Sequence, residues 1–162
     1  MNINNSKLII NATNLHHGGG IQVAVSFLSE LTNLEASFYT VVASSTVDSE
    51  LKKLGTDTNK YASYHVHDSF GFSAILDFKL YRILSSADVV FTVFGPLYCF
   101  LSNTKEIVGF AQPWIIYPEN EIFKKYNLYT CLKIRLKFFI QKLFYFKSDL
   151  LIVEHEHVKK GL

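Results

Sequence analysis

The sequence that decides the fold is IINATNLHHGGGIQVAVSFL, residues 9–28. It predicts a short apolar strand, a polar loop that ends in the glycines at 18–20, and a helix after them. Glycine has no Cβ, so a ligand or another backbone segment can approach it closely. The first N–H groups of a helix have no partner within the helix and lie at the positive end of its dipole. The stretch therefore predicts either a site for an anion such as a phosphate or a plain tight turn between strand and helix.

The common glycine motifs for phosphates are absent from this stretch. It matches neither G-x-G-x-x-G nor G-x-x-x-x-G-K-[ST], and no lysine follows the glycines to hold a phosphate. A dinucleotide-binding protein would also carry an acid at the end of the second strand, where this chain has Ala43-Ser44-Ser45. We therefore expect no dehydrogenase and no resident cofactor.

Strands and helices alternate along the rest of the chain. Apolar and β-branched runs predict strands at 8–12, 37–43, 61–67, 88–93, 105–110 and 149–153. Apolar residues at helical spacing predict helices at 20–32, 73–85 and 119–147, the last interrupted near Asn127. Ser45 or Thr46 is expected to cap a further short helix that stops at Gly55. This order predicts a doubly wound, mainly parallel α/β sheet with right-handed crossovers, in one domain of residues 1–162.

In such sheets ligands bind beyond the carboxyl ends of the strands, where we expect the loops Thr13–Gly20, Phe94–Leu97 and Ala111–Pro118. The second and third loops and their flanks are apolar and aromatic, with Phe94, Tyr98, Phe100, Phe110, Trp114 and Tyr117. Because loops are normally exposed, this apolar surface predicts a cover, which would be a ligand, a lipid or a second domain. The alternative is that these side chains fold back onto the sheet.

Positive charge is concentrated between Leu128 and Ser148, which hold five basic residues and no acid: Lys133, Arg135, Lys137, Lys142 and Lys147. Plotted as a helix, this segment has a broad apolar stripe (Leu132, Leu136, Phe139, Ile140, Leu143, Phe146) and a narrower one opposite (Ile134, Phe138, Tyr145). A helix that packs on a sheet needs only one stripe. The second stripe, flanked by these five basic residues, predicts contact with an anionic membrane surface. A solvated charged face or contact with another domain is the alternative.

Other classes of function find little support. The aromatics of the basic segment lie in helical stripes rather than on a strand platform that stacks bases, so we expect no nucleic acid partner. Glu154-His155-Glu156-His157 resembles a metal cluster, but alternation along an extended chain separates acids from histidines, and we expect no metal. His16-His17 lies beside the glycines, where His17 is a candidate ligand contact. His65 and His67 are more typical of structural residues.

The two cysteines, Cys99 and Cys131, form no CxxC and indicate a reducing cytosol. The first residues lack the basic start and apolar region of a secretory signal. The uncharged stretch Val89–Thr104 is interrupted by Gly95-Pro96 and is too short to span a bilayer. We expect a cytoplasmic protein that is peripheral on the inner face of the membrane.

Four blocks in order resemble the N-terminal Rossmann-like half of a GT-B glycosyltransferase, of the retaining, family-4-like group that builds bacterial surface polysaccharides. They are INATNLHHGGGIQ at 10–22, DVVF at 88–91 with Phe94-Gly95, VGFAQPW at 108–114, and DLLIV at 149–153 with VKKGL at 158–162. The resemblance implies a nucleotide-sugar donor, a saccharide or lipid-linked acceptor, and an N-terminal half that shapes the acceptor side.

The resemblance also implies roles for particular residues. Gly18, Gly19 and Gly20, with His17 beside them, would approach a donor or acceptor phosphate. Further cleft positions would be Phe94, Gly95, Phe110, Gln112 and Trp114, and the segment Lys133–Lys147 would dock on the membrane. Some relatives place a histidine after the fifth strand where this chain has Gln112, so no catalytic role carries over.

The nucleotide-sugar-binding C-terminal half, with its paired glutamates, would begin about where Leu162 stands. We therefore expect a truncated or split transferase that is inactive without that half in cis or in trans. The alternatives are a non-catalytic, membrane-associated acceptor-binding subunit and half of a sugar-nucleotide epimerase.

Overall fold

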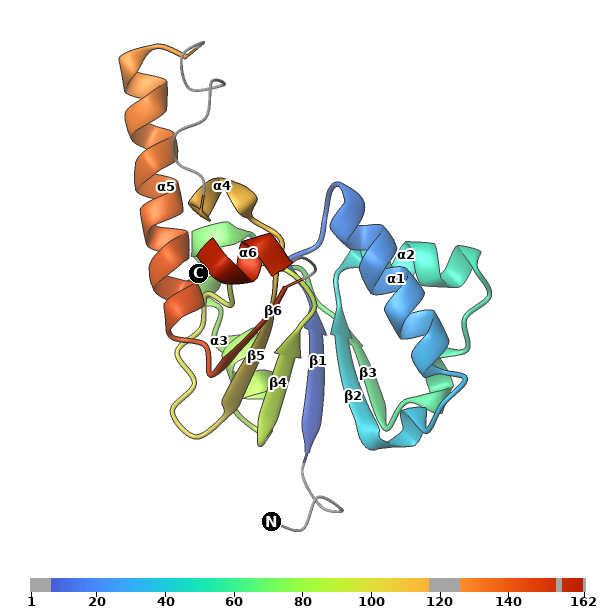
Figure 1. The fold of residues 1–162 in the computed structure, drawn as a ribbon. Coiled ribbons are helices and arrows are strands. Elements are labelled where there is room, and N and C mark those ends of the chain that lie inside the picture. Colours follow the sequence, from blue (N-terminus) through green and yellow to red (C-terminus); the bar gives the residue numbers. More distant parts are fainter. Residues whose placement is uncertain (1–6, 117–125, 154–155, 162) are drawn as a thin grey trace.

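The computed structural model describes residues 7–116, 126–153 and 156–161 (Figure 1). A six-stranded, all-parallel sheet has the order β3-β2-β1-β4-β5-β6. Its strands are β1 Leu8–Ala12, β2 Tyr39–Ala43, β3 Ser63–Val66, β4 Val89–Thr92, β5 Lys105–Phe110 and β6 Leu150–Val153. The predicted doubly wound α/β fold is therefore confirmed.

Helices cover the two faces of this sheet in turn. Ile10 of β1 packs with helices α1 (Gly19–Leu31) and α2 (Ser45–Lys53), through buried residues such as Leu28 and Leu51. Its neighbour Ile9 points to the other face and packs with Leu80 of α3 (Phe78–Leu84). Successive strand residues point to opposite faces, so an apolar run in β1 fills both cores.

Several helix boundaries differ from the prediction because side chains form caps. Ser44, not Ser45 or Thr46, caps α2, and its Oγ accepts a hydrogen bond from Val47 N at 3.2 Å. The helix predicted at 73–85 is divided into the 3₁₀ helix η4 (Gly71–Leu76) and α3. Asp77 separates them, since its Oδ1 accepts from Leu80 N at 2.9 Å and starts a new helix.

The predicted loop 111–118 contains a short helix, α4 (Pro113–Ile116). Helix α5 (Leu128–Phe146) begins after Asn127, whose side chain accepts from Thr130 N at 2.8 Å. The helix predicted from 119 onward falls, up to residue 125, outside the described residues. The remaining short elements are the 3₁₀ helices η2 (Ala36–Phe38) and η3 (Thr58–Lys60) and the helix α6 (Glu156–Gly161).

The two apolar stripes of α5 are exchanged relative to the prediction. The buried residues of the helix are Gln141, Phe144 and Tyr145, which lie on the side of the narrow stripe. The broad stripe faces solvent, with Leu132, Leu136, Phe139, Leu143 and Phe146 exposed. Just beyond the helix, Lys147 Nζ donates to both carboxylate oxygens of the buried Glu106 on β5. This pair ties the carboxyl end of α5 to β5.

Among the described residues, no helix combines the length and the hydrophobicity that crossing a bilayer requires.

Candidate functional site

The candidate site lies at the carboxyl ends of β1 and β4, the neighbouring strands at which the order of the sheet reverses. The loops after these strands are tied together, because Asn14 Nδ2 donates to Phe94 O at 2.7 Å. Gly95 N donates to Gly109 O at 3.1 Å and so joins the loop to β5. Gly95 has a φ of +87°, and a Cβ there would lie 2.7 Å from Asn14 Nδ2. Only glycine fits this position.

The three adjacent glycines of the loop meet different surroundings. Gly18 precedes α1 with a φ of +80°, and a Cβ on Gly20 would lie 3.2 Å from Leu15 Cδ2 and 3.6 Å from Phe94 Cδ2. A Cβ on Gly19 would meet no atom within 4 Å. The fold itself therefore accounts for Gly18 and Gly20 but not for Gly19.

The amino end of α1 is open to a ligand. Within the described part of the chain, no side chain caps it, and its first turn holds no acid. Gly18, Gly19 and the neighbouring His17 are exposed. The N–H groups of the first turn are thus left at the positive end of the helix dipole without a side-chain acceptor, an arrangement that suits an anion.

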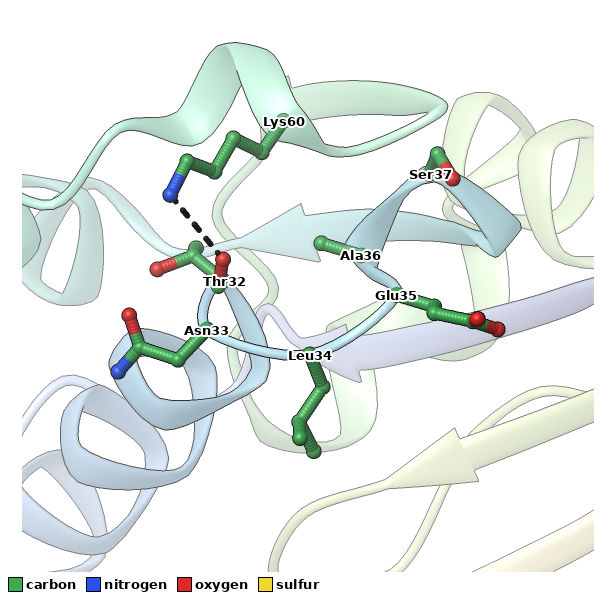
Figure 2. A pocket seen from close by; sticks show the side chains of 7 residues that line it. All are labelled: Thr32, Asn33, Leu34, Glu35, Ala36, Ser37 and Lys60. Atoms are coloured by element: carbon green, nitrogen blue, oxygen red, sulfur yellow. Dashed lines mark hydrogen bonds between the residues drawn. The ribbon is translucent and has the colours of Figure 1, made fainter.

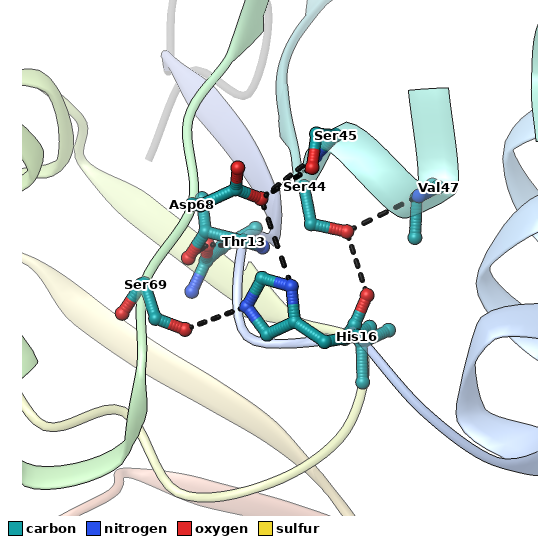
Figure 3. Close-up of polar contacts among 9 residues, drawn as sticks. Thr13, His16, Ser44, Ser45, Val47, Asp68 and Ser69 are labelled. Carbon is teal, nitrogen blue, oxygen red and sulfur yellow. Dashed lines mark hydrogen bonds and ion pairs between the residues drawn. The ribbon is translucent and has the colours of Figure 1, made fainter. Parts of the chain in front are cut away.

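His16, next to the exposed His17, is held within the protein (Figure 3). Its Nε2 donates to Ser69 O at 2.9 Å, since a carbonyl oxygen only accepts. Its Nδ1 lies 3.6 Å from Asp68 Oδ1. The ring stacks on Phe70 with centroids 4.2 Å apart. His16 thereby fixes the glycine loop to the segment after β3.

Sequence reasoning missed Asp68, which supplies a carboxylate at the end of β2. Its Oδ1 accepts hydrogen bonds from Ser45 N at 2.8 Å and from Ser45 Oγ at 3.1 Å (Figure 3). Burial acts to raise the pKa of Asp68, but these bonds outweigh it and the pKa falls below its usual value. The signal was present in the sequence: Asp68 follows the third strand closely, and the carboxyl ends of neighbouring parallel strands meet at one edge.

Two aromatic side chains of the other loops, Tyr98 and Phe110, fold back onto the protein, whereas Phe100 is 64% exposed. Phe110 is buried against Tyr145 with ring centroids 4.7 Å apart, and Tyr98 is buried against Phe144 at 4.9 Å. Phe110 is thus a core residue rather than a wall of the site. Phe94 is half-buried beside Gly20, and Gln112 is half-buried at the start of α4. The side chain of Trp114 and the whole of Tyr117 lie outside the described part of the chain.

A further histidine pair and a cysteine are satisfied within the protein. His67 Nε2 bonds Asp77 Oδ2 at 2.6 Å, and His65 Nε2 lies 2.8 Å from Ser63 Oγ. Burial raises the pKa of the Cys99 thiol to about 11, so this thiol is not a nucleophile near neutral pH. The candidate metal residues Glu154 and His155 lie outside the described residues, as does the side chain of His157. Among the described side chains, no group of three or more His, Cys, Asp or Glu is placed to hold a metal ion.

An open depression of about 510 Å³ lies far from the glycine loop (Figure 2). It is formed by the turn between α1 and β2 and by Lys60, at the amino ends of the strands. Lys60 Nζ donates to Thr32 O at 3.2 Å across it. Among the described residues that line it, Lys60 is bound to the backbone and Glu35 is the other charged side chain.

The basic helix α5 presents an apolar face edged with positive charge. Lys133, Arg135, Lys137 and Lys142 are exposed, like the broad stripe of apolar residues between them. Lys147 differs from these four, since Glu106 binds its ammonium group. The amino-terminal half of α5 extends past the carboxyl ends of the strands, the end of the sheet at which the glycine loop also lies (Figure 1).

Comparison with protein-family models, with curated proteins and with solved structures finds no match to this chain.

Proposed function

We propose that this chain is the acceptor-side half of a glycosyltransferase that works at an anionic membrane surface in the synthesis of a cell-surface polysaccharide. It would transfer a sugar from a nucleotide-sugar to a lipid-linked or saccharide acceptor, together with a C-terminal half in cis or in trans. The observation that carries the proposal is the open amino end of α1 at the β1–β4 switch point. There an unexplained glycine and uncapped N–H groups suit a phosphate of donor or acceptor.

The donor of such a reaction carries a diphosphate, and so does a lipid-linked acceptor of the commonest chemical type. We assign Gly19 to close approach of that phosphate, because the space next to its Cα is open. His17 is exposed beside it and serves as a second contact. Phe94 and Gly95 form the neighbouring wall on the β4 side.

The exposed face of α5 supports action at a membrane. Four exposed cations and a row of exposed apolar side chains lie on one helix that has no acid. Such a helix lies in the interface of an anionic bilayer, with apolar side chains among the acyl chains and lysines at the headgroups. The cytoplasmic leaflet is the anionic one, so the cytoplasmic face is the side that we propose.

Uncovered strand residues favour a further domain. Leu150 and Ile152 lie on one face of the edge strand β6, and both are exposed. Exposed apolar residues in a row on a sheet indicate a contact surface. We propose that a C-terminal half, in cis or in trans, packs against this face of β6.

The deciding experiment measures sugar transfer by mass spectrometry, with the chain alone and with a candidate C-terminal half, across a panel of nucleotide sugars. We expect transfer only from the combination, and a loss of at least about tenfold in Gly19→Ala, which removes close approach to the phosphate. The control is Ser26→Ala, at an exposed position further along α1 and away from its amino end. Transfer by the chain alone, or none with any partner half, contradicts the proposal.

A membrane-associated, non-catalytic subunit that binds the acceptor is the second candidate, because α5 favours membrane contact independently of any chemistry. Flotation with vesicles tests it separately. Binding to anionic but not neutral vesicles, without transfer in any combination, favours the subunit over the transferase.

A further inference from the structure

The segment Phe70–Phe78, which includes η4 and overlaps the helix predicted at 73–85, is apolar and exposed. Its exposed side chains are Phe70, Phe72, Ile75, Leu76 and Phe78. Leu76 and Phe78 have 73% and 79% of their surface exposed, which is extreme for such residues. The division of the predicted helix at Asp77 separates η4 from α3 within this segment.

This segment lies against the base of α5. Ala74 of η4 shares a buried cluster with Tyr98 and with Phe144 of α5, and Ile140 of α5 packs against that cluster. The rings form a chain of contacts, with Phe72 and Tyr98 4.9 Å apart and Tyr98 and Phe144 also 4.9 Å apart. The segment and α5 are therefore neighbouring elements, and each carries exposed apolar residues.

Most exposed charges next to these two elements are positive, and the acid Asp68, two residues before Phe70, is engaged by Ser45 and His16. Asp77 is the only acid between residues 69 and 82, and its carboxylate is occupied by His67 and by Leu80 N. Lys79 and Arg82 are exposed next to it. With the four exposed cations of α5, they make a cationic border around apolar side chains, the complement of an anionic lipid surface.

We propose that Phe70–Phe78 is a second membrane-contacting element, which inserts beside α5 and fixes the orientation of the domain on an anionic bilayer. The inference rests on the membrane contact in the proposed function and adds an orientation to it. A single helix on a bilayer leaves the domain free to roll about the helix axis, and a second contact point removes that freedom. Phe70 begins the segment and stacks on His16, so the same contact holds the glycine loop at the lipid surface.

The test compares two pairs of exposed apolar residues. Leu76→Ser/Phe78→Ser removes the tip of the segment. Leu34→Ser/Phe38→Ser is the matched control, since these residues are 72% and 63% exposed but lie in the turn before β2, at the other end of the sheet. Flotation uses phosphatidylcholine vesicles with and without phosphatidylglycerol. We expect the partition coefficient to anionic vesicles to fall about tenfold in the first variant, as the loss of two apolar anchors implies, and to stay within about twofold in the control.

A fluorescence measurement does not depend on affinity. Leu76→Trp should be quenched by brominated lipid, and Leu34→Trp should not, each compared with the parent that contains only Trp114. If the parent fails to bind anionic vesicles, the membrane contact and this inference fall together. If the parent binds, a Lys133→Ser/Lys137→Ser variant binds less, and the Leu76/Phe78 variant binds like the parent, the inference is overturned while the proposed function stands.

Discussion

At the scale of the residue, the glycines show why one sequence pattern has two explanations. A tight turn and an anion site both need glycine, so the sequence leaves them open. The surroundings separate them: Gly18 has a positive φ, Gly20 is crowded by Leu15, and Gly19 has neither constraint. Asp68 was missed for a related reason, because its bond to Ser45 crosses between strands that are 23 residues apart in sequence.

This difference gives a prediction about stability. Gly19→Ala should leave the free energy of unfolding unchanged or raise it by up to about 1 kcal/mol, because Ala favours a helix over Gly. Gly109→Ala should lower it by several kcal/mol, on the order of 3, since a Cβ there would lie 1.8 Å from Val93 O. Urea unfolding of the two variants measures both values. Similar losses in both would mean that Gly19 is needed by the fold, which removes the main support for a phosphate site.

At the scale of the element, periodicity predicted where strands and helices occur but not how they end or turn. All six strands were predicted within a few residues. The signal is strongest in β1 and β2, whose apolar runs are buried on both faces of the sheet. Asp77 divided one predicted helix, and Lys147 ties the end of α5 to Glu106 of β5. Both effects come from the contacts of one polar side chain, and the periodicity of apolar residues does not indicate such contacts.

Variants of Asp77 can separate the contribution of the helix cap from that of the bond to His67. Its Oδ1 caps α3 and its Oδ2 bonds His67. Asp77→Ala should lower the free energy of unfolding by about 1–2 kcal/mol, since it loses the cap and leaves His67 without its partner. Asp77→Asn keeps a side-chain acceptor for Leu80 N and should lose less. Urea unfolding near pH 7 compares them, and an equal loss in both variants would show that the cap contributes nothing.

At the scale of the whole molecule, alternation of strands and helices predicted the fold class, whereas the placement of the site needed the strand order. The order β3-β2-β1-β4-β5-β6 puts the reversal between β1 and β4 and so brings Asn14 against Phe94. Sequence alone also assigned Phe110 to the site, but its packing on Tyr145 of α5 makes it core. The sequence around Phe110 does not show whether its ring is buried, because the ring that covers it, Tyr145, lies on a helix distant in sequence.

The acids of the molecule predict how its stability depends on pH. The Lys105 ammonium and Glu106 N hold the pKa of Asp149 below its usual value, and hydrogen bonds do the same for Asp68 and Asp77 against the opposing effect of burial. A lowered pKa in the folded state contributes stability that is present above the unfolded pKa, about 4, and is lost as pH falls through the folded value. Glu106 has the opposite sign, because burial raises its pKa despite Lys147. Protonation of Glu106 at low pH therefore increases the free energy of unfolding.

The effect of the three acids with a lowered pKa should exceed that of Glu106, so the free energy of unfolding should decrease between about pH 5 and pH 3. Asp68→Asn removes one of the three and should make this decrease shallower, whereas Glu106→Gln removes the opposing group and should make it steeper. Urea unfolding at a series of pH values gives the three slopes. Glu106→Gln also loses a charged partner for Lys147 and is expected to be less stable at every pH, so the slope rather than the absolute stability is the measurement that decides. A shallower slope in Glu106→Gln would mean that Lys147, and not burial, dominates this carboxyl in the folded protein.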